Sequence, residues 1–398
     1  MKCYLSARAG KINPSPTLTI DAKAKELKAR GENVIGFGAG EPDFDTPAVI
    51  KEAAVCALRE GQTKYTPASG TTTLKKAVCR KYLRKNGIDY KPEEVIICCG
   101  AKHALFNFFQ VTCDPGDEVL LPAPYWVSYL EQIKFAGAHP VVLETSLEEG
   151  FKITPELLQK SITPRTKALV INSPNNPTGA VYSREELSAL LEVVSDRNIL
   201  VVSDEIYEEL NYTGRPHTCI AGLGPEIKGK TVIINGLSKT FAMTGWRIGY
   251  ALGDKKIIKA MAGLQSHSTS NPTTFCQTAA AAALLTPPQE EVNSMIQEFK
   301  KRRDYMVQRV KAVPGLDCLN PDGAFYLFVK MEKLAGRKIA GETVENGDDL
   351  ARILLEKVRV AVVPGSGFGA SLYFRLSYAL GFKEIKEGLD RIERLLAG

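Results

Sequence analysis

The chain has 398 residues, of which 44% are hydrophobic and 24% are charged, which is the composition of an ordinary folded protein. It carries 51 basic and 45 acidic side chains and no dense Lys/Arg block with interleaved aromatic residues, so no nucleic-acid partner is expected. No apolar run approaches the ~18 residues of a membrane span, and the first residues lack the apolar stretch of a signal peptide.

The cysteines indicate a reducing compartment. Nine of them are spread from Cys3 to Cys318 without a CxxC pair, and the chain has only four histidines. Neither a disulfide framework nor a metal site is therefore expected, and we predict a cytoplasmic protein.

From about residue 94 to 253, short β-branched runs alternate with helical patterns. The runs are EVIICC, DEVLLP, HPVVLE, TKALVIN, ILVVSD, TVIING and RIGYALG. This alternation predicts an α/β fold, with a mostly parallel sheet flanked by helices and with ligands at the carboxyl ends of its strands. Ser183 and Glu186 form a predicted capping box before one of the helices.

The C-terminal part predicts a smaller α+β domain. Residues 255–311 have a helical pattern that is interrupted at Pro272 and at Pro287-Pro288. Strand candidates AFYLFV, VRVAVV and LYFRLSY follow, with helices near 347–357 and 383–396. An N-terminal helix at about 17–30 is expected to join this part. We predict a large domain over 48–286 and a discontinuous small domain over 1–47 and 287–398.

Two glycine-rich segments do not match nucleotide-binding motifs. The glycines of IGFGAGEP, at 36, 38 and 40, do not form G-x-G-x-x-G, so NAD binding is rejected there. The SKT at 238–240 lacks the preceding glycines of a P-loop.

Four strand ends carry the chemistry: NSPNNPTG, SDEIYEEL, SKTFAMTGWR and FRLSYA. Together with AGEPDFDTP, KYTPASG and PYWVSY, their order and spacing resemble the class I aminotransferases, and especially the bacterial-type aspartate aminotransferase subgroup. The resemblance covers essentially the whole chain. It implies fold type I, the cofactor pyridoxal 5′-phosphate (PLP), small-molecule substrates that are amino acids and 2-oxo acids, and a homodimer with shared active sites.

The resemblance implies that four residues bind the cofactor around its ring. Lys239, read alone, is either a solvated cation or an amine aimed into a crevice; by resemblance it forms the Schiff base with PLP and moves a proton. That role requires an amine pKa lowered by burial or by a cation such as Arg247. Asp204 would bind the pyridine nitrogen, and Tyr207 and Asn176 the phenolic oxygen. Read alone, Asp204 could cap a helix and Asn176 could belong to an Asn-Pro turn.

The phosphate of PLP needs hydrogen-bond donors. Arg247 offers a fork of N–H groups, and Gly100 and Ala101 stand where VIICC gives way to a helix, whose first N–H groups form an anion site. The resemblance adds Tyr65 from the neighbouring subunit and places Trp126 on the pyridine face.

Substrate recognition is assigned to a second set. Arg375 inside the apolar run LYFRLSY is costly to bury unless it is paired, and by resemblance it binds the α-carboxylate together with Gly40. The resemblance implies that Trp126 and Asn176 also contact the substrate. Lys102, helped by Ser15 and Thr17, would bind the distal carboxylate, although a lysine on a helix surface is the alternative.

The chain departs from the family pattern at two positions. Relatives often have Ser three residues before the lysine, where this chain has Gly236, so one phosphate hydroxyl is expected to be missing. Relatives that accept prephenate usually have Lys where this chain has Asn13.

The predicted reaction is L-aspartate + 2-oxoglutarate = oxaloacetate + L-glutamate by a ping-pong mechanism. The alternatives are an aminotransferase for aromatic amino acids, kynurenine, alanine or prephenate, and a PLP C–S lyase. A regulatory protein on the same fold would need a separate DNA-binding segment of ~60 residues, for which the lobes leave no room.

Overall fold

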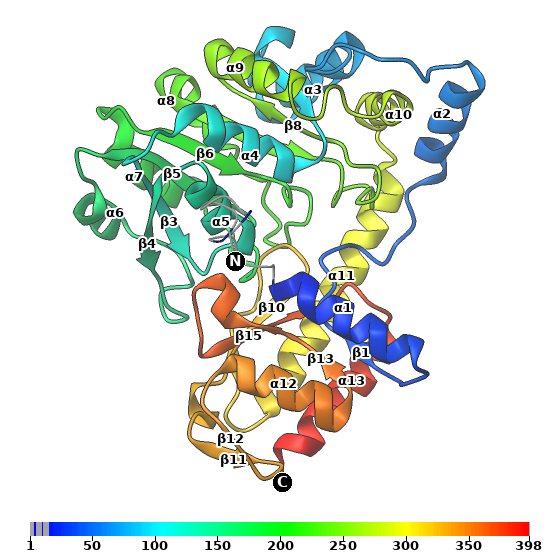
Figure 1. The fold of residues 1–398 in the computed structure, drawn as a ribbon, viewed down its shortest axis with the longest axis vertical. Helices are drawn as coiled ribbons and strands as arrows, with labels where there is room; N and C mark the ends of the chain where they lie inside the picture. The colour runs from blue at the N-terminus through cyan, green and yellow to red at the C-terminus, as the bar shows by residue number, and fades with distance from the viewer. Residues whose placement is uncertain (1–3, 5–9, 11–15, 398) are drawn as a thin grey trace.

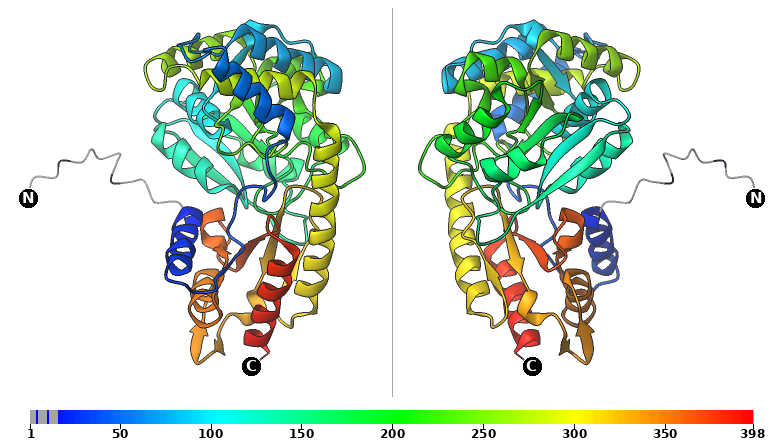
Figure 2. Two further views of the ribbon diagram at one scale, coloured as in Figure 1. Left: turned by 90° about the vertical axis from the view of Figure 1, so that its right-hand side faces the viewer. Right: turned by 90° about the vertical axis from the view of Figure 1, so that its left-hand side faces the viewer.

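In the computed structural model, which describes residues 4, 10 and 16–397, the chain forms a large and a small lobe (Figures 1 and 2). The large lobe is built on a seven-stranded sheet in the order β2-β8-β7-β6-β5-β3-β4. All neighbours are parallel except β8, which is antiparallel to β2 and β7. The strands are β2 (Val95–Cys98), β3 (Glu118–Ala123), β4 (His139–Glu144), β5 (Thr166–Asn172), β6 (Leu200–Asp204), β7 (Thr231–Gly236) and β8 (Gly249–Leu252).

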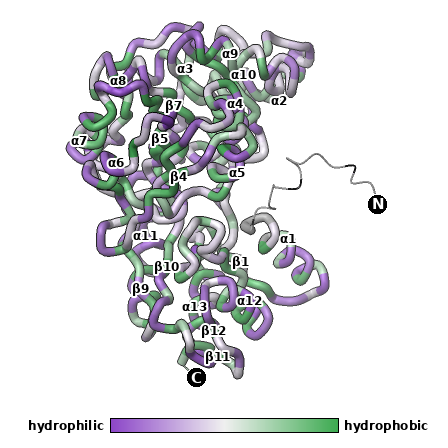
Figure 3. The backbone as a smooth tube through the Cα atoms, turned by 60° about the vertical axis from the view of Figure 1, so that its left-hand side comes forward, coloured by the Kyte–Doolittle hydropathy of each residue, from purple (hydrophilic) through white to green (hydrophobic). Residues whose placement is uncertain are grey.

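Helices cover both faces of this sheet, which explains why its strands are apolar almost throughout. Alternate residues of the strands face two different layers. One layer contains α4 (Ala101–Thr112), α5 (Val127–Phe135) and α9 (Lys255–Ser266). The other contains α2 (Ala48–Arg59), α3 (Thr72–Asn86), α6 (Pro155–Ser161), α7 (Arg184–Ser195), α8 (Pro225–Lys230) and α10 (Thr274–Leu285). Figure 3 shows hydrophobic segments inside this lobe and hydrophilic ones on outer helices such as α7 and α8.

The small lobe is built on an antiparallel sheet in the order β14-β15-β10-β9. The long helix α11 (Gln289–Ala312) reaches from the large lobe along this sheet (Figure 2). The other elements are α1 (Pro16–Ala29), β1 (Ile35–Gly36), β9 (Asp317–Cys318), β10 (Tyr326–Lys330), β11 (Arg337–Ile339), β12 (Glu342–Val344), α12 (Gly347–Val358), β13 (Val360–Ala361), β14 (Val363–Pro364), β15 (Tyr373–Ser377) and α13 (Phe382–Leu396). β1 pairs with β13 in parallel, so the N-terminal segment is joined to this lobe.

The predicted α/β fold class is confirmed, and each predicted strand of the large sheet is present. The capping box is present too: the Ser183 hydroxyl accepts from the Glu186 N–H, and the Glu186 carboxylate accepts from the Ser183 N–H. The domain boundaries at 47/48 and 286/287 stay a prediction. Within the described residues, no helix is long and apolar enough to cross a membrane.

Candidate active site

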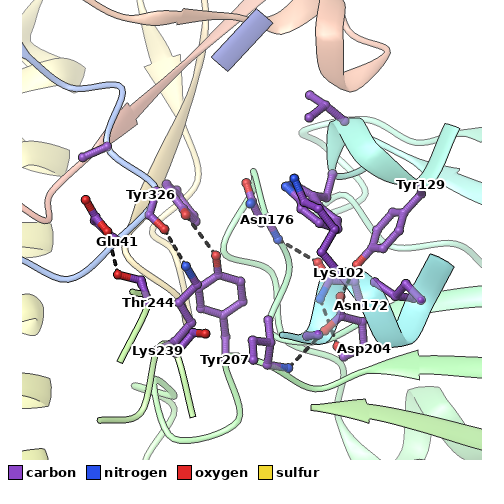
Figure 4. Close-up of a pocket in the computed structure, with 18 of the residues that line it drawn as sticks. Glu41, Lys102, Tyr129, Asn172, Asn176, Asp204, Tyr207, Lys239, Thr244 and Tyr326 are labelled. Atoms are coloured by element: carbon purple, nitrogen blue, oxygen red, sulfur yellow. Dashed lines mark hydrogen bonds between the residues drawn. The ribbon is translucent and has the colours of Figure 1, made fainter. Parts of the chain in front are cut away.

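A cavity of about 500 Å³ lies between the lobes, at the carboxyl ends of β5, β6 and β7 (Figure 4). Such strand ends are where open α/β sheets bind ligands. The cavity is lined by ten of the residues predicted for the site: Gly40, Ala101, Lys102, Trp126, Asn176, Asp204, Tyr207, Lys239, Arg247 and Arg375.

Lys239 lies three residues after β7, and its half-buried side chain enters the cavity. Its Nζ donates a hydrogen bond of 2.5 Å to the carbonyl of Gly40. The pKa of this amine is lowered to about 8, chiefly by removal from water and also by the charges of Arg247 and Arg375, against the opposing charges of Glu41 and Asp204. The amine can therefore give up and take back a proton near neutral pH.

Asp204 ends β6 and is only 3% exposed. Its Oδ2 accepts a 2.7 Å hydrogen bond from the Tyr129 hydroxyl, and its Oδ1 accepts one from the Ile206 N–H. Burial raises the pKa of this carboxyl to about 6 despite both hydrogen bonds. A buried carboxylate of this kind is suited to hold a proton on a basic nitrogen in the cavity.

Arg375, on β15, is 1% exposed. Its two terminal nitrogens donate to Asn176 Oδ1 (2.9 Å) and to the carbonyl of Gly38 (3.1 Å). Its Cζ lies 4.2 Å from the ring centre of Tyr326. Within the described residues it has no ion pair, and its Nε has no hydrogen-bond partner. A buried arginine without a counter-ion indicates that the cavity takes an anion.

Arg247 is held at the start of α4 by two backbone carbonyls, those of Thr244 (2.9 Å) and Cys99 (3.2 Å). Gly100, with φ +87°, caps this helix, and a Cβ there would stand 2.4 Å from a guanidinium nitrogen of Arg247. The first N–H groups of a helix have no partner within it. Helix start and guanidinium together form a second site for an anion.

Lys102 and Trp126 both line the cavity. The Lys102 amine lies 4.9 Å from the ring centre of Trp126, which packs edge to face on Tyr129. Lys102 is exposed to solvent at the cavity wall, so a ligand that fills the cavity can reach it.

Three of the residues predicted for the site are not found at the cavity among the described side chains. Tyr65 lies between α2 and α3, is 90% exposed and does not line the cavity. Ser15 lies outside the described residues. Thr17 belongs to the first turn of α1, but its side chain is not described.

The cavity also contains residues that the sequence analysis missed. They are Lys25, Gly38, Ala39, Glu41, Leu105, Val127, Tyr129, Asn172, Ile206, Ser238, Thr244 and Tyr326. A hydroxyl was expected to be missing from the site because residue 236 is glycine. Ser238 brings a hydroxyl to the cavity wall one residue before Lys239. Tyr129 could have been found from its place in PYWVSY, three residues after Trp126 and hence on the same face of a helix.

Comparison with known proteins agrees with this geometry. A family model described as aminotransferase class I and II matches residues 32–392. The chain is 54% identical to the aspartate aminotransferase of Geobacillus stearothermophilus, over 98% of each chain. It is 48% identical to a probable aspartate/prephenate aminotransferase of Aquifex aeolicus, over 100% of this chain and 99% of the relative.

Solved structures extend the similarity to the fold. The aspartate aminotransferase of Rhizobium meliloti has a TM-score of 0.95 at 42% identity over 99% of each chain. The aspartate aminotransferase of Thermus thermophilus with maleate has a TM-score of 0.92 at 44% identity over 100% of each chain.

Proposed function

The chain belongs to the class I and II aminotransferase family, and we propose that it transfers the amino group of L-aspartate to 2-oxoglutarate in a ping-pong reaction. The observation that carries this proposal is the single cavity that contains Lys239, Asp204 and Arg375. An amine with a lowered pKa, a buried carboxyl and an arginine without a counter-ion are the groups that transamination of an α-amino acid requires.

We propose PLP as the cofactor. The residues present fit it, because the cavity has an anion site at Arg247 and the start of α4, and a buried carboxyl at its floor. Lys239 would bind the cofactor covalently, Asp204 would hold its ring nitrogen, and Tyr207 and Asn176 its phenolic oxygen. When bound, PLP supplies an electron sink for negative charge on the substrate Cα.

The residues of the chain then divide the remaining work. Arg375 binds and orients the α-carboxylate with two N–H groups. Lys239 Nζ moves the proton to and from the substrate Cα, for which its pKa of about 8 is suited. Trp126 covers one side of the cavity and excludes water.

Gly100→Ala is expected to weaken the binding of PLP at least about tenfold, because its Cβ would displace the Arg247 guanidinium. Titration of the apoprotein with PLP, followed by absorbance, measures this. Gly31→Ala is the matched control: Gly31 has nearly the same φ, +86° against +87°, but nothing lies within 4 Å of its added Cβ. Equal affinities for PLP in both variants would contradict the anion site.

We propose that the distal carboxylate of aspartate binds near Lys102. The cavity is lined by five cations, namely Lys25, Lys102, Lys239, Arg247 and Arg375, and by two acids, Glu41 and Asp204. This excess of positive charge suits a dicarboxylate in addition to the cofactor phosphate.

Lys102→Ala is expected to lower kcat/KM for aspartate about 10- to 100-fold and to change kcat/KM for alanine less than about threefold, since only aspartate has a distal carboxylate. Half-reaction rates measured with both amino acids test this. Lys256→Ala is the matched control, because Lys256 is also an exposed lysine at the second position of a helix. An equal loss for aspartate and alanine would leave Lys102 with no role in specificity.

The reaction itself is tested by a panel of amino acids with purified holoenzyme. Aspartate alone should bleach the absorption band of the bound cofactor, and 2-oxoglutarate should restore it. The panel includes aromatic amino acids, kynurenine and alanine, and prephenate serves as an acceptor because some relatives are named aspartate/prephenate aminotransferases. An unchanged spectrum with aspartate would refute the proposed donor.

We propose a homodimer in which Tyr65 reaches the cofactor phosphate of the partner subunit. Its exposure of 90% supports this, because the side chain is open to contact with a second chain. Sedimentation should give a mass of about twice 43.5 kDa. A cytoplasmic location stays a prediction, supported by the eight free cysteines of the described residues.

A further inference from the structure

Two buried tyrosines meet at the wall of the cavity. Tyr207 lies three residues after the end of β6, and Tyr326 is the first residue of β10 in the other lobe. Their hydroxyl oxygens lie 2.9 Å apart, as the dashed line in Figure 4 shows. A contact of this length contains one hydrogen, so only one of the two hydroxyls donates to the other.

The position of the Tyr326 hydroxyl is fixed by its surroundings. The Arg375 guanidinium covers its ring at 4.2 Å, and the neighbouring Phe325 packs on it with ring centres 4.6 Å apart. The backbone of Tyr326 is paired with Ser377 in the sheet. Within the described part of the chain, neither hydroxyl has another hydrogen-bond partner.

The hydroxyl hydrogen of Tyr207 has two possible directions. It can point to Tyr326, or it can point into the cavity, which both residues line. Under the proposed function, the phenolic oxygen of PLP takes the hydrogen of Tyr207. The 2.9 Å contact then persists only if Tyr326 supplies the hydrogen between the two oxygens.

We propose that Tyr326 is a positioning residue: its hydroxyl donates to the Tyr207 oxygen and thereby directs the Tyr207 hydroxyl into the cavity. This inference rests on the proposed function, because it needs a cofactor oxygen as the acceptor of Tyr207. A phenol that accepts one hydrogen bond becomes a better donor of another. Tyr326 therefore strengthens the contact of Tyr207 with the cofactor without touching the cofactor oxygen itself.

The expected consequence concerns the proton that the cofactor oxygen shares with Lys239 Nζ. Donation from Tyr207 stabilises negative charge on that oxygen, which is greatest after the proton has left. If Tyr207 donates less strongly, the deprotonated form is less stable and the proton is lost less readily. The absorption band of the bound cofactor then titrates at a higher pH. The charged groups that face the two tyrosines are Arg375, Asp204, Glu41 and Lys239, and a Tyr→Phe substitution removes none of these charges.

The test is a spectrophotometric pH titration of holoenzyme without substrate. In Tyr326→Phe the apparent pKa of the band should rise by about 0.1 to 0.6 unit, because the Tyr207 hydrogen bond to the cofactor remains and loses only its cooperative share. Tyr378→Phe is the matched control, because its hydroxyl is equally buried in the same lobe but bonds the carbonyl of Ala324, away from the cavity. If Tyr326→Phe does not fold, Tyr326→Met, which also lacks the hydroxyl, replaces it.

A double variant separates this inference from the function on which it rests. In a Tyr207→Phe background, the added Tyr326→Phe should produce no further shift. A full further shift would mean that Tyr326 acts through another group, and no shift in Tyr326→Phe alone would equally overturn the inference. If Tyr207→Phe itself leaves the titration unchanged, the proposed cofactor contact of Tyr207 fails as well.

Discussion

Lys239→Ala is expected to lower kcat for aspartate at least about 10⁴-fold, because the amine is proposed both to bind the cofactor and to move the substrate proton. Its pKa of about 8, lowered first by burial, suits a group that must be a free amine at one stage and an ammonium at the next. No nearby amine replaces it: among the described residues that line the cavity, the other lysines are Lys25 and Lys102, which lie on different helices. Stopped-flow absorbance of the aspartate half-reaction measures the loss.

Two further measurements separate proton transfer from charge. Lys239→Arg keeps a cation at this position but not a titrating amine, since the guanidinium pKa is far above neutral. It should be as inactive as Lys239→Ala. A small primary amine in solution should restore part of the rate in Lys239→Ala, and the rescue should grow with pH as the added amine loses its proton. A Lys239→Ala enzyme within about 100-fold of the native rate would contradict the assigned role.

Much of the site could be predicted from the sequence because its residues follow parallel strands. Asp204 ends one apolar run and Lys239 follows the next, and the carboxyl ends of neighbouring parallel strands meet at one edge. The apolar runs are nearly continuous because helices cover both faces of the sheet. The resemblance supplied the roles, and the geometry that brings these side chains together follows from the strand order.

The residues that were missed act through contacts between distant segments. The Glu41 carboxylate accepts a 2.6 Å hydrogen bond from the Thr244 hydroxyl, 203 residues away, and joins the two lobes beside Lys239. Tyr326 meets Tyr207 across 119 residues. A tyrosine in an apolar strand is normally a core residue, and nothing local shows that its hydroxyl faces a partner. Such contacts could not be predicted from the sequence, because they depend on how the two lobes pack against each other.

Gly100 illustrates a partial success. The sequence placed it at an anion-binding helix start beside Arg247, but not in contact with that side chain. The structure adds the reason for glycine at this position: φ is +87°, and a Cβ would collide with the guanidinium. Local motifs predicted the hydrogen-bond donors, but the close contact between Gly100 and the Arg247 side chain could be seen only in the three-dimensional structure.

Arg375→Met is expected to lower kcat/KM for aspartate about 10²- to 10⁴-fold, the cost of removing one partner from a buried charge pair. The side chain is 1% exposed and has no counter-ion among the described residues, so a substrate carboxylate is its proposed partner. Arg375→Lys should lose less, about 10- to 100-fold, because it keeps the charge but not the planar fork. Steady-state kinetics of both variants give the two values.

The effect should depend on the α-carboxylate itself. β-Alanine is aspartate without that group, so the native preference for aspartate over β-alanine should collapse in Arg375→Met. Arg303→Met is the matched control: Arg303 is a buried arginine on α11 that donates to Pro321 O, outside the cavity, and its loss should affect stability rather than substrate preference. If Arg375→Met kept the preference for aspartate, the α-carboxylate would bind elsewhere in the cavity. If Arg303→Met instead lost the preference to the same extent, general loosening of the small lobe, rather than one guanidinium, would account for the change.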